Sequence, residues 1–214
     1  MHAGRLITVE GLDGAGKSTL VEGLAAALAE LGRPVEVLRE PGGVELAERL
    51  RTLVKDPAAV VHARAEALLY AAARAQLVSE RLAPALAAGG WVLLDRFVDS
   101  SLAYQGAGRG LGVEAVAAIN AFATGGLTPD KTLLLWIDPA ERRRRLATRG
   151  EAADRLEGEP EAFFATIAGA YGELAAAEPQ RFAVLDAGRA PSDVLRAALD
   201  ALALLLAATP RSDT

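Results

Sequence analysis

The chain lacks cysteine and has little histidine, and both scarcities narrow its chemistry. Without cysteine, the 214 residues form no disulfides, thiolate zinc sites, iron–sulfur clusters or cysteine nucleophile. With only His2 and His62, a histidine triad or a multi-histidine metal site is not expected. The absence of cysteine also fits a cytoplasmic location, which we expect.

The chain also has few lysines, a negative net charge and no long hydrophobic run. Lysine occurs only at positions 17, 55 and 131, and 28 acidic against 23 basic residues give a net charge of −5. Nucleic-acid-binding proteins usually present a basic surface, so we expect no nucleic-acid partner. The most apolar stretch, 201–208, is far shorter than the roughly 20 residues of a membrane span, so no membrane partner is expected.

Short apolar runs alternate with helical patterns along the chain, which predicts an α/β fold with a central parallel sheet and helices on both faces. The expected strands are 6–10, 35–38, 91–94, 132–137 and 182–185. The expected helices are 17–31, 44–54, 60–88 with a bend or a restart near Pro84, 113–123, 139–149, 160–177 and 192–208, the last capped by Ser192. We expect a polar loop at 96–112, a single domain over 1–209 with a short lid at about 149–159, and a frayed tail at 210–214.

A glycine-rich motif between the first expected strand and helix predicts a phosphate site. Residues 11–18, GLDGAGKS, match G-x-x-x-x-G-K-[ST] in full. The glycines let backbone N–H groups surround phosphate oxygens, and the helix N-terminus adds positive partial charge. Lys17 would reach the β- and γ-phosphates, and the Ser18 hydroxyl would ligate Mg²⁺. The ATP-binding candidates are Gly11, Leu12, Asp13, Gly14, Ala15, Gly16, Lys17, Ser18 and Thr19.

Asp95 follows the buried run WVLL, at a strand end where metal-binding carboxylates gather. We therefore predict that Ser18 and Asp95 hold Mg²⁺; the alternative is that Asp95 only caps a turn. No N-K-x-D base-reading motif is present, which disfavours a GTPase.

A second set of residues suits a nucleotide acceptor. Tyr70 and Arg74 are four residues apart, so they share one helix face. An aromatic ring, arginine side chains and several hydroxyls and amides suit a nucleobase with a monophosphate. Taken singly, Tyr70 could be a core residue, and Arg51 and Arg74 could be solvated.

Five segments together carry a family resemblance: GLDGAGKST (11–19), REPGG (39–43), YAAARAQ (70–76), DRFVDSSLAYQGAGRG (95–110) and RGEAADRLE (149–157). The combination resembles the thymidylate kinase family, in its bacterial branch with a basic lid. The resemblance implies a P-loop nucleoside monophosphate kinase fold with a five-stranded parallel sheet, ATP and dTMP as substrates, Mg²⁺ as cofactor, and a homodimer.

The resemblance also implies catalytic roles. Asp13 would meet the 3′-hydroxyl of the acceptor sugar and help organise the metal region, and Arg96 would bridge the two phosphate groups. Arg145 would lie on the adenine. Gly14 stands where the eukaryotic branch has an arginine, so lid arginines would act instead; one of them could pair only with Glu151, Asp154 or Glu157. The catalytic candidates are Asp13, Lys17, Asp95, Arg96, Arg149 and Arg155.

On the acceptor side, the resemblance implies that Tyr70 lies against the thymine, where the family usually has phenylalanine, and that Arg74 reaches a base carbonyl. Ser101 and Gln105 would read the base edge, and Tyr104 would crowd a 2′-hydroxyl. The dTMP-binding candidates are Asp13, Arg39, Pro41, Arg51, Tyr70, Arg74, Arg96, Ser100, Ser101, Tyr104 and Gln105.

Two alternatives remain open at this point. One is a kinase for another monophosphate, namely dUMP, dCMP or GMP. The other is a P-loop switch or partner-binding module without an acceptor. ATP turnover that depends on added dTMP separates these possibilities.

Overall fold

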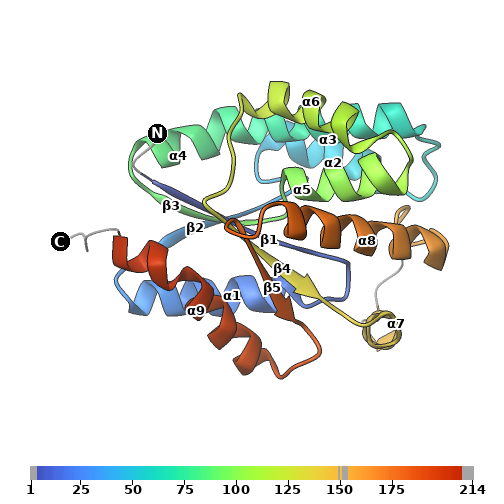
Figure 1. Cartoon of the computed structure of the whole chain (residues 1–214). Helices are drawn as coiled ribbons and strands as arrows, with labels where there is room; N and C mark the ends of the chain where they lie inside the picture. The colour runs from blue at the N-terminus through green and yellow to red at the C-terminus, as the bar shows by residue number, and fades with distance from the viewer. Residues whose placement is uncertain (1–3, 149, 151–153, 209–214) are drawn as a thin grey trace.

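The computed structural model describes residues 4–148, 150 and 154–208. Within them, five strands form one parallel sheet in the order β2-β3-β1-β4-β5 (Figure 1). The strands are β1 (Arg5–Gly11), β2 (Val35–Arg39), β3 (Trp91–Asp95), β4 (Lys131–Trp136) and β5 (Phe182–Asp186). The predicted α/β fold and five-stranded parallel sheet are confirmed.

Helices cover both faces of this sheet, as parallel strands require. They are α1 (Lys17–Glu30), α2 (Glu45–Lys55), α3 (Ala63–Leu77), α4 (Ala83–Ala87), α5 (Val98–Ser101), α6 (Val113–Thr124), α7 (Pro139–Thr148), α8 (Glu161–Ala177) and α9 (Pro191–Ala208). Two π-helical segments, η1 (Val78–Leu82) and η2 (Leu102–Gly108), complete the helical structure that is described. No helix among these is long and apolar enough to cross a membrane.

Alternating side chains of the strands build two cores. Leu93 of β3 packs with the side chains of α1 and α9 on one face. Its neighbours Val92 and Leu94 pack with α3 and η1 on the other. In Figure 1, α1 and α9 lie below the sheet, and α3, α4 and α6 lie above it. Because successive side chains of a strand point to opposite faces of the sheet, apolar residues in a row are buried on both faces.

Two sequence expectations are corrected. Residues 96–112 are largely helical, because α5 and η2 occupy 98–108. The last helix begins at Pro191, so Ser192 lies inside it and does not cap it. The long helical stretch runs from 63 to 87, and its α-helical geometry restarts at Ala83 after the π-helical η1, which confirms the predicted restart near Pro84. A proline lacks the N–H that closes a helical turn, so a local change of hydrogen-bond pattern is expected there.

Candidate active site

The carboxyl ends of β1, β2 and β3 meet at a cavity of about 560 Å³. Register places Arg39 beside Asp95 and Asp95 beside Val9, so residues that follow these strands converge. The cavity wall includes most of the candidate residues: Asp13, Gly14, Gly16, Lys17, Ser18, Thr19, Arg39, Pro41, Arg51, Tyr70, Asp95, Arg96, Ser100, Ser101, Tyr104, Gln105 and Arg145. One cavity thus joins the phosphate motif to the proposed acceptor residues.

The phosphate loop requires glycine where the backbone is left-handed or crowded. Gly11 has φ +134°, and a Cβ there would lie 2.6 Å from the carbonyl oxygen of Leu135. Gly16 has φ +95° and immediately precedes α1. The helix N-terminus therefore points its free N–H groups into the cavity. Gly11, Leu12 and Ala15 are not in the wall.

Lys17 is buried at the start of α1, with its ammonium turned back onto the loop. Its Nζ donates to the carbonyl oxygens of Gly11 at 3.2 Å and Leu12 at 3.0 Å. It lies 3.7 Å from an oxygen of Asp13. Burial, with the nearby charge of Arg96, lowers the pKa of Lys17. Phosphate oxygens would replace these carbonyls as its partners.

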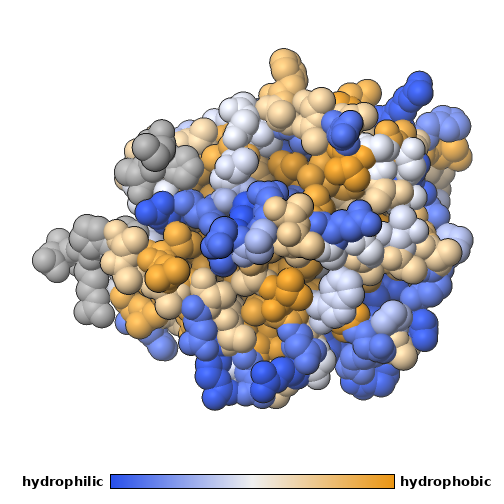
Figure 2. All heavy atoms as spheres, viewed as in Figure 1, coloured by the Kyte–Doolittle hydropathy of each residue, from blue (hydrophilic) through white to orange (hydrophobic). Residues whose placement is uncertain are grey.

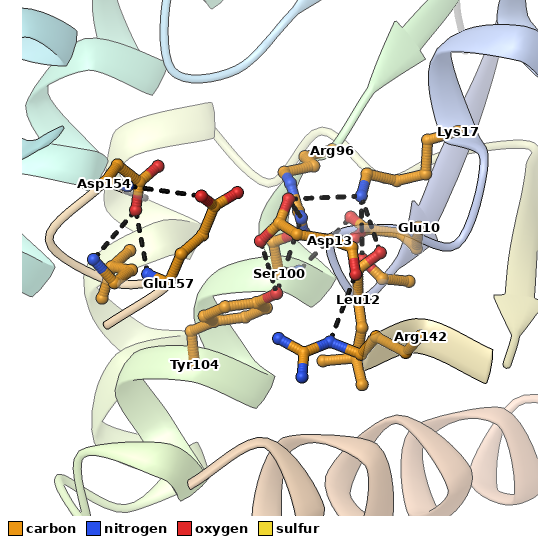
Figure 3. Close-up of polar contacts among 12 residues, drawn as sticks. Glu10, Leu12, Asp13, Lys17, Arg96, Ser100, Tyr104, Arg142, Asp154 and Glu157 are labelled. Atoms are coloured by element: carbon orange, nitrogen blue, oxygen red, sulfur yellow. Dashed lines mark hydrogen bonds and ion pairs between the residues drawn. The ribbon is translucent and has the colours of Figure 1, made fainter. Parts of the chain in front are cut away.

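Asp13 and Arg96 form an ion pair at the centre of the site (Figure 3). Arg96 Nη2 lies 2.7 Å from Asp13 Oδ1, and Nη1 donates to Ser100 Oγ at 3.1 Å. The Tyr104 hydroxyl points to the same carboxylate at 3.4 Å. Burial acts to raise the pKa of Asp13, but Arg96 and Lys17 outweigh it and hold the pKa well below its usual value. The carboxylate is therefore anionic in the working pH range.

Asp95 and Ser18 fit a magnesium site. Both line the cavity, and Asp95 Oδ1 is buried without a hydrogen-bond donor among the described residues. Buried carboxylate oxygens normally have a partner, so this atom suits a cation. The described residues contain no group of three or more acidic, histidine or cysteine side chains placed to hold a metal. Mg²⁺ commonly takes only one or two protein ligands and completes its shell with phosphates and water.

The cavity wall also contains Tyr70 from α3, Arg51 from α2 and Arg39 from the end of β2. Arg51 Nη1 donates to the carbonyl of Pro41 at 2.8 Å. Arg39 is more exposed and lies 2.9 Å from a carboxylate oxygen of Glu48. Both guanidinium groups therefore lie at the wall, where an acceptor phosphate could bind them.

Arg74 lies next to the cavity and is not among the residues of its wall. It is 1% exposed and lies behind the cavity wall. Its guanidinium pairs with Glu40 at 2.6 Å, donates to the Phe97 carbonyl at 2.9 Å and to Ser101 Oγ at 3.0 Å, and contacts Asn120. Burial raises the pKa of Glu40 to about 7, although Arg74 opposes the shift. Arg74 meets the cavity through Ser101, so its contact with a base carbonyl stays a prediction.

Two of the four arginines at 142–145 lie near the cavity: Arg145 is in its wall, and Arg142 is buried. Arg145 lies in the wall and donates to the carbonyl oxygens of Ala15 at 3.4 Å and Ala187 at 2.7 Å. This position beside the phosphate loop is compatible with its expected place on the adenine. Arg142 is also buried. It donates to the Asp13 carbonyl at 3.2 Å and lies over the Phe164 ring.

The lid arginines are only partly placed. Arg149 lies outside the described residues. Arg155 does not line the cavity; its Nε donates to the Val54 carbonyl at 2.9 Å, and its guanidinium lies 2.7 Å from Glu66. Arg155 therefore pairs with Glu66 rather than with Asp154 or Glu157.

Three buried glutamates near the site were missed by sequence reasoning: Glu10, Glu40 and Glu66. Glu10 accepts hydrogen bonds from the Phe97 N–H at 2.7 Å, the Ser100 hydroxyl at 2.6 Å and the Tyr171 hydroxyl at 2.8 Å. Burial, with Asp99 nearby, raises its pKa. The one available signal was position, because Glu10 ends an apolar strand directly before the glycine-rich motif.

Comparison with known proteins agrees with this geometry. A family model described as thymidylate kinase matches residues 9–198. A thymidylate kinase of Deinococcus radiodurans is 52% identical over 197 residues, which cover 92% of this chain and 95% of the relative. One from Lactobacillus delbrueckii is 48% identical, with 92% and 94% covered. One from Pelotomaculum thermopropionicum is 44% identical, with 98% and 99% covered. The chain belongs to the thymidylate kinase family.

Proposed function

We propose that the cavity binds ATP and dTMP together and transfers the γ-phosphate to dTMP, giving dTDP. Family membership supports this reaction: the chain is a kinase of the thymidylate type, an α/β P-loop enzyme of nucleotide biosynthesis that uses ATP. The observation that carries the proposal is the shared cavity, in which the phosphate loop and Tyr70 lie in one wall. In the same wall, Arg96 forms an ion pair with Asp13 of the phosphate loop.

Charge neutralisation is the main task in such a transfer, because ATP and the acceptor phosphate are both anionic. Lys17 and the N-terminus of α1 would bind the donor phosphates, and Arg96 would bridge the two phosphate groups. Arg39 and Arg51 would hold the acceptor phosphate. No general base is required, since the acceptor phosphate is already an anion at neutral pH. The Asp13 carboxylate, anionic and hydrogen-bonded by Tyr104, would accept a hydrogen bond from the sugar hydroxyl.

Ser18 and Asp95 would hold Mg²⁺, and their place in the wall supports this assignment. Held by these two residues, Mg²⁺ would supply positive charge that offsets the negative charge of the phosphate groups. Arg149 and Arg155 remain the candidates for an additional arginine at the transferring group. For Arg155 that role requires leaving Glu66.

A homodimer and a cytoplasmic location complete the proposal. Exposed apolar side chains support the dimer: Leu53 on α2, Leu68 on α3 and Phe122 on α6, the last 91% exposed. Helix α3 packs against both α2 and α6. Figure 2 shows hydrophobic surface at the top of the view, where α6 lies. Large exposed apolar side chains gathered on neighbouring elements are typical of an interface. Light scattering on the purified chain measures the mass directly.

The test of the reaction is ADP release from Mg·ATP with dTMP, dUMP, dCMP or GMP, or with no acceptor. Strongest turnover with dTMP and almost none without an acceptor is the expected result. Turnover that is indifferent to every monophosphate would refute the acceptor site and leave only the phosphate loop.

A further inference from the structure

Glu66 is a fully buried carboxylate in the first turn of α3. It lies four residues before Tyr70 and eight before Arg74, so the three share one helix face. A buried carboxylate is costly unless charged or polar groups satisfy it. Its contacts therefore indicate what the residue does.

The two oxygens of Glu66 accept hydrogen bonds from Gln105 and Arg109 and form an ion pair with Arg155. Oε1 accepts from Gln105 Nε2 at 2.9 Å and from Arg109 Nε at 3.2 Å. Oε2 accepts from Arg109 Nη2 at 3.1 Å and lies 2.7 Å from Arg155 Nη2. Gln105 belongs to η2, and Arg155 belongs to the turn at 154–159. One carboxylate thus joins α3, the end of η2 and the lid segment.

This arrangement fixes the direction of the Gln105 amide. An ion-paired carboxylate offers only acceptors, so Gln105 must present its NH₂ group to Glu66. Gln105 lines the cavity although it is only 2% exposed. With Nε2 held by Glu66, the carbonyl oxygen Oε1 is the Gln105 atom that can accept a hydrogen bond from a ligand.

We propose that Glu66 is a positioning residue that sets acceptor specificity through Gln105, an inference that rests on the proposed function. By holding Nε2, it keeps Oε1 as an acceptor at the base end of the cavity. Thymine and uracil carry an N–H at ring position 3 and can donate to it. Cytosine has a lone pair at that position, so two acceptors would face each other. Sites that depend on one hydrogen-bonding group reject analogues that lack its partner.

The same carboxylate also anchors the lid turn, so an experiment must separate the two effects. Arg109 binds Glu159 at 2.6 Å, and Lys55 binds Asp154 at 2.9 Å. Asp154 in turn accepts the backbone N–H groups of Leu156 and Glu157 at 2.9 and 3.0 Å (Figure 3). The variant Glu159→Gln weakens this anchoring through Arg109 and leaves the Glu66–Gln105 hydrogen bond in place. It is therefore the matched control.

The test compares dUMP and dCMP as competitors of dTMP turnover, because these two differ at the ring edge and not at position 5. In Glu66→Gln, the new amide can donate to Gln105 and let it reverse. We expect the preference for dUMP over dCMP to fall roughly tenfold or more, with KM for ATP unchanged. In Glu159→Gln, the preference should stay at the wild-type value. An unchanged preference in Glu66→Gln, or no preference in the wild type, would overturn the inference.

A double-mutant cycle keeps the result interpretable. Gln105→Leu should lose the same preference, and Glu66→Gln combined with it should lose no more. A further loss of preference in the double variant would assign Glu66 a separate structural effect and overturn the inference. If Glu66→Gln does not fold, Glu66→Asp keeps the charge, shortens the reach to Gln105 and gives the same readout. Absence of dTMP turnover in the wild type would instead refute the proposed function.

Discussion

Replacing Arg96 is expected to lower kcat for dTMP phosphorylation by about 10²–10³-fold, the usual effect of losing one charge-stabilising donor in a transition state. Arg96 places its guanidinium 2.7 Å from Asp13, inside the cavity that would hold both phosphates. Its backbone has φ +70°, the one positive φ of a non-glycine residue among those described. Such strain persists where the surrounding structure imposes it. The side chain and the backbone of Arg96 can therefore be tested separately.

Two variants make that separation. Arg96→Met removes the charge and keeps a residue with a Cβ in the left-handed backbone conformation. Arg96→Gly removes the charge and also relieves the strain of that conformation. Left-handed geometry costs about 1–2 kcal/mol for a residue with a Cβ. Glycine loses about 0.5–1 kcal/mol more conformational freedom on folding. Arg96→Gly should therefore exceed Arg96→Met in stability by about 0.5–1 kcal/mol, which is a few degrees in Tm at this chain length.

The assay is ADP release at saturating Mg·ATP and dTMP, together with thermal unfolding of each variant. Both variants should lose activity alike, because both lose the guanidinium. Arg96→Met retaining more than about a tenth of wild-type kcat would refute the role at the transferring group. Arg96→Met matching or exceeding the stability of Arg96→Gly would refute the argument from backbone strain.

Four shorter predictions address the other site residues. Lys17→Ala should abolish turnover in a chain that still folds by circular dichroism; residual activity near wild type would contradict it. Asp95→Asn should raise the Mg²⁺ concentration for half-maximal rate by about tenfold or more, since a neutral amide is a weaker ligand than a carboxylate; an unchanged Mg²⁺ curve counts against Asp95 as a ligand. Because the folded-state pKa of Asp13 lies below its usual value, its stabilising effect is present at neutral pH and is lost as pH falls below about 4. The Tm gap between wild type and Asp13→Asn should therefore stay constant from about pH 7 to about pH 5 and begin to narrow below about pH 4, and a gap that narrows at higher pH or is unchanged at about pH 3 would contradict this. Arg74→Ala should weaken dTMP binding, spare ATP binding, and destabilise the fold by about 3–5 kcal/mol, because Glu40 is left buried and unpaired; calorimetric titrations that show equal loss for both nucleotides exclude an acceptor-side role.

Local sequence signals predicted the sheet and the phosphate loop well. The run WVLL could only be a strand buried on both faces, and GLDGAGKS depends on neighbours in the chain rather than on distant contacts. The segment 96–112 was misjudged because its polar and glycine residues suggested a loop. Ser100 and Gln105 are instead buried within helical turns, where partners from β1 and α3 satisfy them. These hydrogen bonds come from residues distant in the sequence, so no periodic sequence pattern predicts that Ser100 and Gln105 are buried.

Charged residues were the harder part of the site to predict. Arg74 and Arg155 were expected at the substrates, yet Glu40 and Glu66 hold both of them behind or beside the cavity. In a sequence, a buried glutamate is indistinguishable from a solvated one, because burial depends on which distant cation faces it. The burial of Arg142 is equally hard to predict, because its guanidinium contacts the Phe164 ring and the Asp13 carbonyl, which are distant from it in the sequence.

The buried glutamates have a common consequence for the acceptor end of the cavity. Glu10 binds the Ser100 hydroxyl, and Glu66 binds the Gln105 amide. Glu40 holds Arg74, which in turn binds Ser101. Each of these three wall side chains is thus held by a buried carboxylate, directly or through Arg74. Fixed dipoles and hydrogen-bonding groups discriminate between ligands better than mobile ones, because they do not reorganise to fit the wrong partner. We therefore expect selectivity for the base to depend on these buried carboxylates as well as on the side chains that they hold.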